Sequence, residues 1–266
     1  MPERRRTVTV APDRQAELAL MLHGLKLPAM AETFADLALK AAKANLTHEA
    51  FLYELVQAEH SSRAEHRIAR LRRQSGLPLE KTFAGLDLGR YPPAIQLQVE
   101  RLRSGTFLHD AVNVVAAGKP GVGKSHLLAA LGHDLILQGH PVLWTSTASL
   151  VQRLLVAKRE LRLPQMLAQL DRFALLILDD IGYVQHDRDE MEVLFTLLAE
   201  RYERRSVAIT TNLLFSEWDR IFKDPMTTMA AIDRLVHHST ILEFGGESLR
   251  ARKAKDKGAA DTTAKS

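Results

Sequence analysis

The amino-acid sequence predicts an α/β fold: a parallel sheet flanked by helices, preceded by a small all-helical N-terminal domain. Three observations predict it. Residues 14–75 show no strand-like alternation, short apolar runs alternate with amphipathic helical stretches after residue 110, and a glycine-rich segment joins the first of these runs to a helix. The 266 residues leave room for one large and one smaller domain.

The N-terminal part is predicted to be helical because its apolar residues keep helical spacing. Leu18, Leu20 and Leu25 begin one apolar face, and Thr47 is expected to cap a later helix. The pattern breaks at 76–78 and again at 90–93, where glycine and proline occur. We therefore expect a helical domain over 1–75, a candidate for binding DNA or a partner, and a linker over 76–95.

Short apolar runs after residue 110 are expected to be strands. They lie at 112–117, 141–144, 173–178, 206–211 and 240–244, with helical stretches between them. Strands that alternate with helices indicate a parallel sheet covered on both faces. This second domain is expected over 96–249. Residues 250–266 are rich in Lys, Ala and Asp with almost no large apolar residue, which is typical of a disordered basic tail.

The glycine-rich segment after the first expected strand satisfies the phosphate-loop pattern G-x-x-x-x-G-K-[ST]. Its glycines let backbone N–H groups turn toward phosphates, and the helix that follows directs its positive end at them. We expect Lys124 to reach the β- and γ-phosphates of ATP and the Ser125 hydroxyl to bind Mg²⁺. The expected nucleotide-binding residues are Gly118, Lys119, Pro120, Gly121, Val122, Gly123, Lys124, Ser125 and His126.

Two further strands end in polar residues. The apolar run over 173–178 leads into Asp179 and Asp180, which places carboxylates at the carboxyl edge of the sheet. Asp179 is expected to hold Mg²⁺, and Asp180 to orient the attacking water. Asn212 follows the strand over 206–211 and is a candidate to contact the γ-phosphate or that water; a turn-forming asparagine is the alternative. Lys124, Asp180 and Asn212 are therefore the expected catalytic residues.

Composition favours a soluble cytoplasmic protein. The chain contains no cysteine, which excludes disulfides and thiol catalysis, and no apolar run approaches the roughly 20 residues that cross a bilayer. The net charge of +4 is unevenly distributed, because 1–12, 60–75 and 250–266 are basic while the remainder is acidic. Basic segments suggest an anionic partner such as nucleic acid, although they could equally serve solubility.

A row of arginines lies within the basic segment over 60–75. Arg63, Arg67 and Arg70 are spaced i, i+4 and i+7, and Arg73 lies close by. Such a row could follow the phosphates of double-stranded DNA without reading its sequence. The alternative is a solvated helix face.

The order of these motifs resembles the AAA+ branch of the P-loop NTPases, and more narrowly the IstB-type helper ATPases of bacterial insertion sequences. The DnaC-type helicase loaders and DnaA-type initiators share that core. The Arg-Tyr-Glu-Arg and Asp-Arg-Leu-x-His-His segments are more specific than the phosphate loop. The resemblance covers residues 118–128, 175–183, 194–204, 210–212, 215–218, 221–222, 232–238 and 248–250.

The resemblance implies an ATPase that hydrolyses ATP to ADP and phosphate, forms an ATP-dependent oligomer on DNA and assists a partner transposase. Arg234 matches the arginine that such proteins direct at a neighbouring subunit's ATP; a surface salt bridge is its alternative. Arg250 resembles a second phosphate sensor. Three positions depart from the family pattern: Asp180 where many members have Glu, Thr211 where many have Ser, and Leu249 where Tyr is usual.

Two other functions compete with a transposition helper. A DnaC-like loader of a replicative helicase would share the same core. A nucleotide kinase is disfavoured, because no segment resembles a lid or an acceptor site, and a kinase has no need of Asn212 and Arg234 together.

Overall fold

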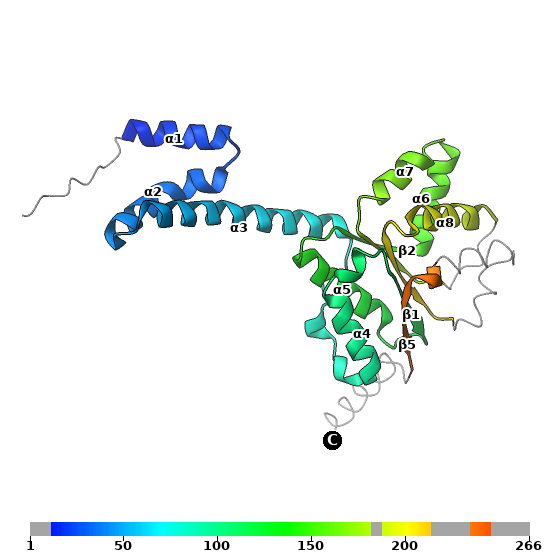
Figure 1. Ribbon diagram of the computed structural model, residues 1–266. Coiled ribbons are helices and arrows are strands. Elements are labelled where there is room, and N and C mark those ends of the chain that lie inside the picture. Colours follow the sequence, from blue (N-terminus) through cyan, green and yellow to red (C-terminus); the bar gives the residue numbers. More distant parts are fainter. Residues whose placement is uncertain (1–11, 182–187, 214–234, 246–266) are drawn as a thin grey trace, which may run out of the picture. The chain divides into compact units, whose positions relative to one another are not determined.

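The computed structural model describes residues 12–181, 188–213 and 235–245 (Figure 1). The chain separates into two compact units, Met1–Ala69 and Arg70–Ser266. The division falls within helix α3 (His48–Ser75), slightly before the boundary expected at residue 75. The segment over 76–95 also differs from the expected linker, because Leu77, Leu86 and Tyr91 are buried in the larger unit.

The smaller unit contains α1 (Pro12–Gly24), α2 (Pro28–Ala44) and most of α3. Pro28 occupies the first turn of α2, where a missing N–H costs nothing. Asn45 ends α2 in the left-handed conformation, with a φ of 52°. Thr47 caps α3 as expected, since its Oγ1 accepts the N–H of Ala50 at 3.2 Å.

The described part of the smaller unit buries few apolar side chains. Only Met30 and Leu55 belong to its core, whereas the expected apolar face is largely solvent-exposed: Leu20 is 73% exposed and Leu25 is 70% exposed. The carboxylate of Glu59 is buried instead, 5% exposed, and accepts the N–H of Met30 in the first turn of α2 at 3.1 Å. Glu59 therefore supplies from α3 the cap that Leu27, an apolar residue at the start of α2, does not provide.

The larger unit is built on a parallel sheet of five strands in the order β2-β3-β4-β1-β5. Its strands are β1 (Asn113–Gly118), β2 (Val142–Ser146), β3 (Leu175–Asp179), β4 (Ser206–Thr211) and β5 (Ser239–Phe244). All four pairs of neighbouring strands are parallel, and β1 and β4 are buried along their whole length. The strand positions and the fold class expected from the sequence are confirmed.

Helices cover both faces of the sheet (Figure 1). On one face lies α5 (Lys124–Leu137), where Gly132 lets Leu77 and Ile177 approach closely, together with α4 (Pro93–Arg103). On the other face α6 (Thr147–Arg159), α7 (Leu163–Leu170) and α8 (Arg188–Arg201) pack on Leu176 and Leu178 of β3. Alternate residues of β3 thus point to opposite faces, which is why the strand reads as a continuous apolar run.

Short 3-10 turns precede the sheet, at Phe83–Gly85, Leu88–Arg90 and Thr106–Leu108. None of the helices in the described ranges is both long and apolar enough to span a membrane.

Candidate nucleotide site

The phosphate loop connects β1 to α5 at the carboxyl edge of the sheet. Gly118 has a φ of 149°, and a Cβ at this position would lie 2.5 Å from the carbonyl oxygen of Phe244 on β5. Only glycine can therefore bring the end of β1 so close to the neighbouring strand. Gly123, with a φ of 105°, then turns the chain into the first residue of α5. Backbone N–H groups at this helix N-terminus are available to an anion.

Lys124 is the first residue of α5 and is buried, with 6% of its surface exposed. Its Nζ donates to the carbonyl oxygens of Gly118 at 2.6 Å and Lys119 at 2.9 Å, and to Oδ1 of Asn212 at 2.8 Å. A lysine ammonium has three N–H donors. The loop thus holds the ammonium group in place by hydrogen bonds, and a phosphate oxygen that binds Nζ must replace at least one of these acceptors.

The two expected Mg²⁺ ligands lie together. Ser125 Oγ donates to Oδ1 of Asp179 at 2.7 Å, although the two residues lie 54 positions apart in the sequence. Asp179 is the last residue of β3, and its backbone oxygen also accepts from Thr147 at the start of α6 at 3.2 Å. The hydroxyl and the carboxylate are oxygen donors, which suit a hard divalent cation.

Asp180 lies just beyond the end of β3 in a strained conformation. Its φ is 64°, in the left-handed region that non-glycine residues seldom adopt. Burial, together with the neighbouring Asp179 carboxylate, raises the pKa of Asp180, and the Lys124 ammonium opposes that rise. The carboxylate accepts a hydrogen bond from Nδ2 of Asn212 at 3.3 Å.

Asn212 joins the two halves of the site. Its amide oxygen accepts from Lys124, while its amide nitrogen donates to Asp180. The structure therefore brings Lys124, Asp180 and Asn212 together. The hydroxyl of Thr210 links this set to Asp179 and its partner Ser125, so that one hydrogen-bonded cluster forms at the ends of β1, β3 and β4. These residues fit ATP and Mg²⁺, because a basic group, a helix N-terminus and two oxygen donors converge. Within the described ranges no group of three or more His, Asp or Glu could hold a metal ion.

Sequence reasoning missed two side chains that contribute to this site, those of Thr210 and Tyr91. Thr210 on β4 donates its hydroxyl to Asp179 at 2.7 Å and accepts the N–H of Asp180 at 2.7 Å. Tyr91 donates its hydroxyl to the backbone oxygen of Val122 at 3.2 Å, and the His126 ring lies 2.9 Å from the oxygen of Thr82. The signal for Thr210 was a hydroxyl near the carboxyl end of a buried strand, two residues before Asn212. Contacts of the segment over 76–95 with the phosphate loop had no sequence signal.

Comparison with known proteins identifies the family. The model of the IstB-like ATP-binding proteins matches residues 20–257. The chain belongs to the IstB-like ATP-binding protein family. An insertion-sequence ATP-binding protein of Sinorhizobium fredii is 44% identical over 91% of this chain and 82% of its own length. The ATP-binding protein of insertion sequence IS21 from Pseudomonas aeruginosa is 37% identical over 91% of both chains. The resemblance stated from the sequence is thus confirmed.

Solved structures with the same fold include those of DnaA and DnaI. This IstB-like chain matches DnaA of Aquifex aeolicus bound to AMPPCP, with a TM-score of 0.55, 17% identity and coverage of 68% of this chain and 56% of that one. It also matches DnaI, with a TM-score of 0.52, 19% identity and coverage of 67% and 98%. At this identity the likeness establishes the P-loop AAA+ fold.

The structure describes only some of the arginines expected at functional positions. Arg234 and Arg250 lie outside the described residues. The arginines proposed to contact DNA are all exposed on α3. Arg63 is held by Glu59, with Nε 2.8 Å from Oε1, and also donates to the carbonyl oxygen of Lys26. Arg63 therefore has a structural role within the smaller unit, whatever its contact with DNA.

Arg201 and Arg204, in a family-specific segment, have different roles. Arg201, 2% exposed, donates to the carbonyl oxygens of Leu170, Phe173 and Ser206, each at 2.9 Å, and burial lowers its pKa to about 10. It joins the end of α7 to the starts of β3 and β4. Arg204 pairs on the surface with Asp171 at 2.9 Å and Glu200 at 3.5 Å.

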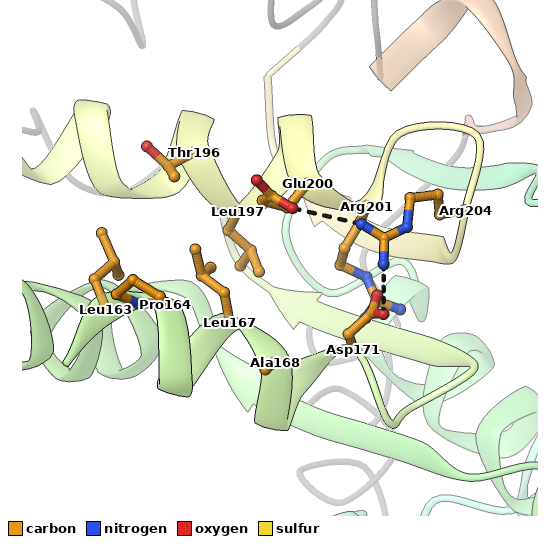
Figure 2. A pocket seen from close by; sticks show the side chains of 10 residues that line it. All are labelled: Leu163, Pro164, Leu167, Ala168, Asp171, Thr196, Leu197, Glu200, Arg201 and Arg204. Carbon is orange, nitrogen blue, oxygen red and sulfur yellow. Dashed lines mark hydrogen bonds and ion pairs between the residues drawn. The ribbon is translucent and has the colours of Figure 1, made fainter.

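A hollow of about 380 Å³ lies between α7 and α8 beside these arginines (Figure 2). Its apolar walls come from both helices, and the Asp171–Arg204–Glu200 pairs border one end. It lies between the two helices and is lined by none of the clustered nucleotide-site residues. The walls are Leu163, Pro164, Leu167, Ala168, Thr196 and Leu197.

Proposed function

We propose that this IstB-like protein is a Mg²⁺-dependent ATPase that assembles on double-stranded DNA and assists the transposase of an insertion sequence. The observation that carries the proposal is the single hydrogen-bonded cluster of Lys124, Asp179, Asp180 and Asn212. Nucleotide binding alone does not require Asp180, whose carboxylate lies beside Asp179 and whose backbone is strained. Hydrolysis, in contrast, requires a group that orients the attacking water. Relatives named for insertion sequences supply the biological setting.

In the proposed mechanism each group has one task. The N–H groups of the phosphate loop and Lys124 bind the β- and γ-phosphates, with Lys124 exchanging a loop carbonyl or Asn212 for a phosphate oxygen. Ser125 and Asp179 would hold Mg²⁺, which supplies positive charge to the phosphates when bound. Asp180 orients the attacking water and accepts its proton at a carboxylate oxygen, while Asn212 fixes that carboxylate.

Arg234 is proposed to act on the ATP of a neighbouring subunit, and Arg250 to act as a second phosphate sensor. A guanidinium is permanently charged and binds phosphate oxygens with two parallel hydrogen bonds. Hydrolysis would then depend on assembly, because no subunit alone would complete the site.

The exposed arginines of α3 are proposed to contact DNA: Arg63, Arg67, Arg70 and Arg73. Arg63 would also keep its ion pair with Glu59. Phosphate contacts of this kind bind any duplex sequence and weaken as salt rises. This suits a helper that must accept many target sites.

The proposal is tested by measuring ATP turnover and sedimentation with and without duplex DNA, then strand transfer by the cognate transposase. We expect assembly on DNA with ATP and a transposase whose activity requires this protein. ATP turnover without any effect on the transposase, together with loading of a replicative helicase, would replace the proposal by the helicase-loader alternative. Absence of turnover in every condition would contradict the ATPase itself.

Subunit cooperation is tested by mixing two variants. Lys124→Ala should not bind ATP productively, and Arg234→Ala should bind ATP but lose on the order of 10³-fold in turnover. In mixed oligomers some interfaces pair an intact phosphate loop with an intact arginine, so part of the activity should return. If the two variants assemble together but no activity returns, the alternative is favoured, in which Arg234 forms a surface salt bridge.

A further inference from the structure

The hydroxyl of Thr210 stands between the two aspartates of the site. Thr210 lies on β4 and is 2% exposed. Its Oγ1 donates to Oδ1 of Asp179 and accepts the N–H of Asp180, both at 2.7 Å. A threonine hydroxyl has one proton to donate, and this one is used on Asp179. Both partners therefore depend on the same oxygen atom.

The backbone of Thr210 makes a third contact with the same stretch. Its carbonyl oxygen accepts the N–H of Ile181 at 3.0 Å. Regular pairing between β3 and β4 ends at Leu178 and Ile209, before the aspartates. Beyond that point the side chain of Thr210 takes the N–H of Asp180, and its backbone takes the next one. Thr210 thus bridges the residues on both sides of the left-handed turn at Asp180.

A left-handed conformation at a non-glycine residue persists only when surrounding contacts hold it. Asp180 has a φ of 64°, and the contacts from Thr210 fix both of its peptide groups. The same atom, Oδ1 of Asp179, accepts a second hydrogen bond from Oγ of Ser125, also at 2.7 Å. Once Ser125 turns to a cation, Thr210 is the donor that would still orient the Asp179 carboxylate.

We propose that Thr210 is a positioning residue of the nucleotide site: its hydroxyl sets the orientation of Asp179 for Mg²⁺ and the left-handed turn of Asp180 for water. It contacts no substrate and acts through the two carboxylates. The proposal rests on the proposed function, since it assumes the roles assigned there to Asp179 and Asp180. A buried threonine that served the fold alone would have no reason to bond both aspartates.

The decisive variant is Thr210→Val, which keeps the shape and the branched Cβ but removes donor and acceptor. Thr210→Ser restores the hydroxyl. Thr211→Val is the matched control, because Thr211 is fully buried on the same strand and its hydroxyl accepts only the N–H of Leu213, at 3.1 Å, among the bonds described. Thr210→Cys, of similar volume and weak hydrogen-bonding power, takes the place of the valine variant if that chain does not fold.

The first readout is the affinity for a non-hydrolysable ATP analogue with and without Mg²⁺, by equilibrium titration. In Thr210→Val the gain in affinity from Mg²⁺ should fall by about tenfold or more, the loss expected for one hydrogen bond to a charged group. Affinity without Mg²⁺ should stay within about threefold, since Lys124 and the loop are untouched. Thr210→Ser should recover the Mg²⁺ effect, and Thr211→Val should retain it.

The second readout is steady-state hydrolysis. Thr210→Val should lower kcat by about 100-fold while KM changes less, because Asp180 loses its orientation in the transition state. An unchanged Mg²⁺ effect on affinity in Thr210→Val overturns the proposal, as does a wild-type chain with no Mg²⁺ effect. Equal losses of affinity with and without Mg²⁺, alongside lower stability, indicate a purely structural residue. A wild-type chain that binds ATP with Mg²⁺ yet never hydrolyses it contradicts only the proposed function.

Discussion

The two units of the chain differ in how they use buried polar groups. The carboxyl edge of the sheet, here called the nucleotide edge because it carries the clustered site residues, contrasts in this respect with the helical unit over Met1–Ala69. At the nucleotide edge, buried or half-buried polar side chains bond one another above a continuous apolar core. In the described helical unit, one buried carboxylate holds two helices together, and large apolar side chains such as Tyr53, 68% exposed, face solvent.

This contrast has a physical reason. A sheet covered on both faces buries enough apolar surface to tolerate a strained residue such as Asp180. A unit whose described core is Met30 and Leu55 gains little from burial, so single polar contacts matter more to its stability. The larger unit can therefore hold a pre-organised site, whereas the described part of the smaller unit leaves apolar and basic side chains exposed.

The largest expected effect is at the nucleotide edge. Asp180→Asn should keep ATP affinity within about threefold but lower turnover on the order of 10³-fold, because an amide cannot accept the proton of water. Its side chain still occupies the same space beside Asn212. Turnover within about threefold of wild type would show that the strained carboxylate has no catalytic task.

Arg201 tests the core that supports this edge. Arg201→Ala removes the donors to three backbone carbonyls and should destabilise the larger unit by about 3 kcal/mol in denaturant unfolding. The control is Arg204→Ala, which breaks exposed ion pairs and should cost no more than about 0.5 kcal/mol. Equal effects of the two variants would contradict the assignment of Arg201 as the buried connector.

Glu59 tests the smaller unit. Burial alone would raise the pKa of Glu59, but hydrogen bonds from Arg63 and from the N–H of Met30 outweigh it, so the pKa lies below the ordinary value. Glu59→Gln should weaken the unit by about 1–2 kcal/mol near neutral pH, and Arg63→Ala by a similar amount. Hydrogen exchange of α2 measures this directly.

The pH dependence follows from the direction of that shift. Because the folded pKa is lowered, the ionised carboxylate stabilises the folded unit above the unfolded pKa of about 4.3, and this stabilisation is lost as pH falls through the folded pKa. Glu59→Gln should remove that part of the acid sensitivity. ATP affinity should be unchanged, and a coupled loss of affinity would break the contrast between the two units.

The smallest expected effect concerns DNA. Arg70→Ala with Arg73→Ala should weaken binding to any duplex by about tenfold and reduce the salt slope by about 2. Arg63 is left intact because its removal also breaks the pair with Glu59. Lys40→Ala with Lys43→Ala, which removes two exposed lysines from α2, is the charge-matched control. Unchanged affinity and slope in the arginine variant would assign this face of α3 to solvent.

The sequence determined the fold class, the strands and the core of the nucleotide site. Buried strands followed by Asp179 or Asn212 indicate the carboxyl edge of a parallel sheet. The phosphate loop must lie at the same edge, because it joins the carboxyl end of β1 to α5. Local patterns suffice for these features, because each strand and the polar residues at its end are adjacent in the sequence.

Only the tertiary structure decided which groups meet. The segment over 76–95 looks like a linker, because its glycines and prolines break helical spacing, yet Tyr91 bonds the phosphate loop. Arg63 looks like part of a basic surface, yet it donates to the carbonyl oxygen of Lys26, 37 positions earlier. Thr210 looks like a strand residue, yet its hydroxyl orients two aspartates. Such contacts join residues about thirty positions apart or more. Sequence periodicity does not reveal them, because it indicates only which face of an element a residue lies on.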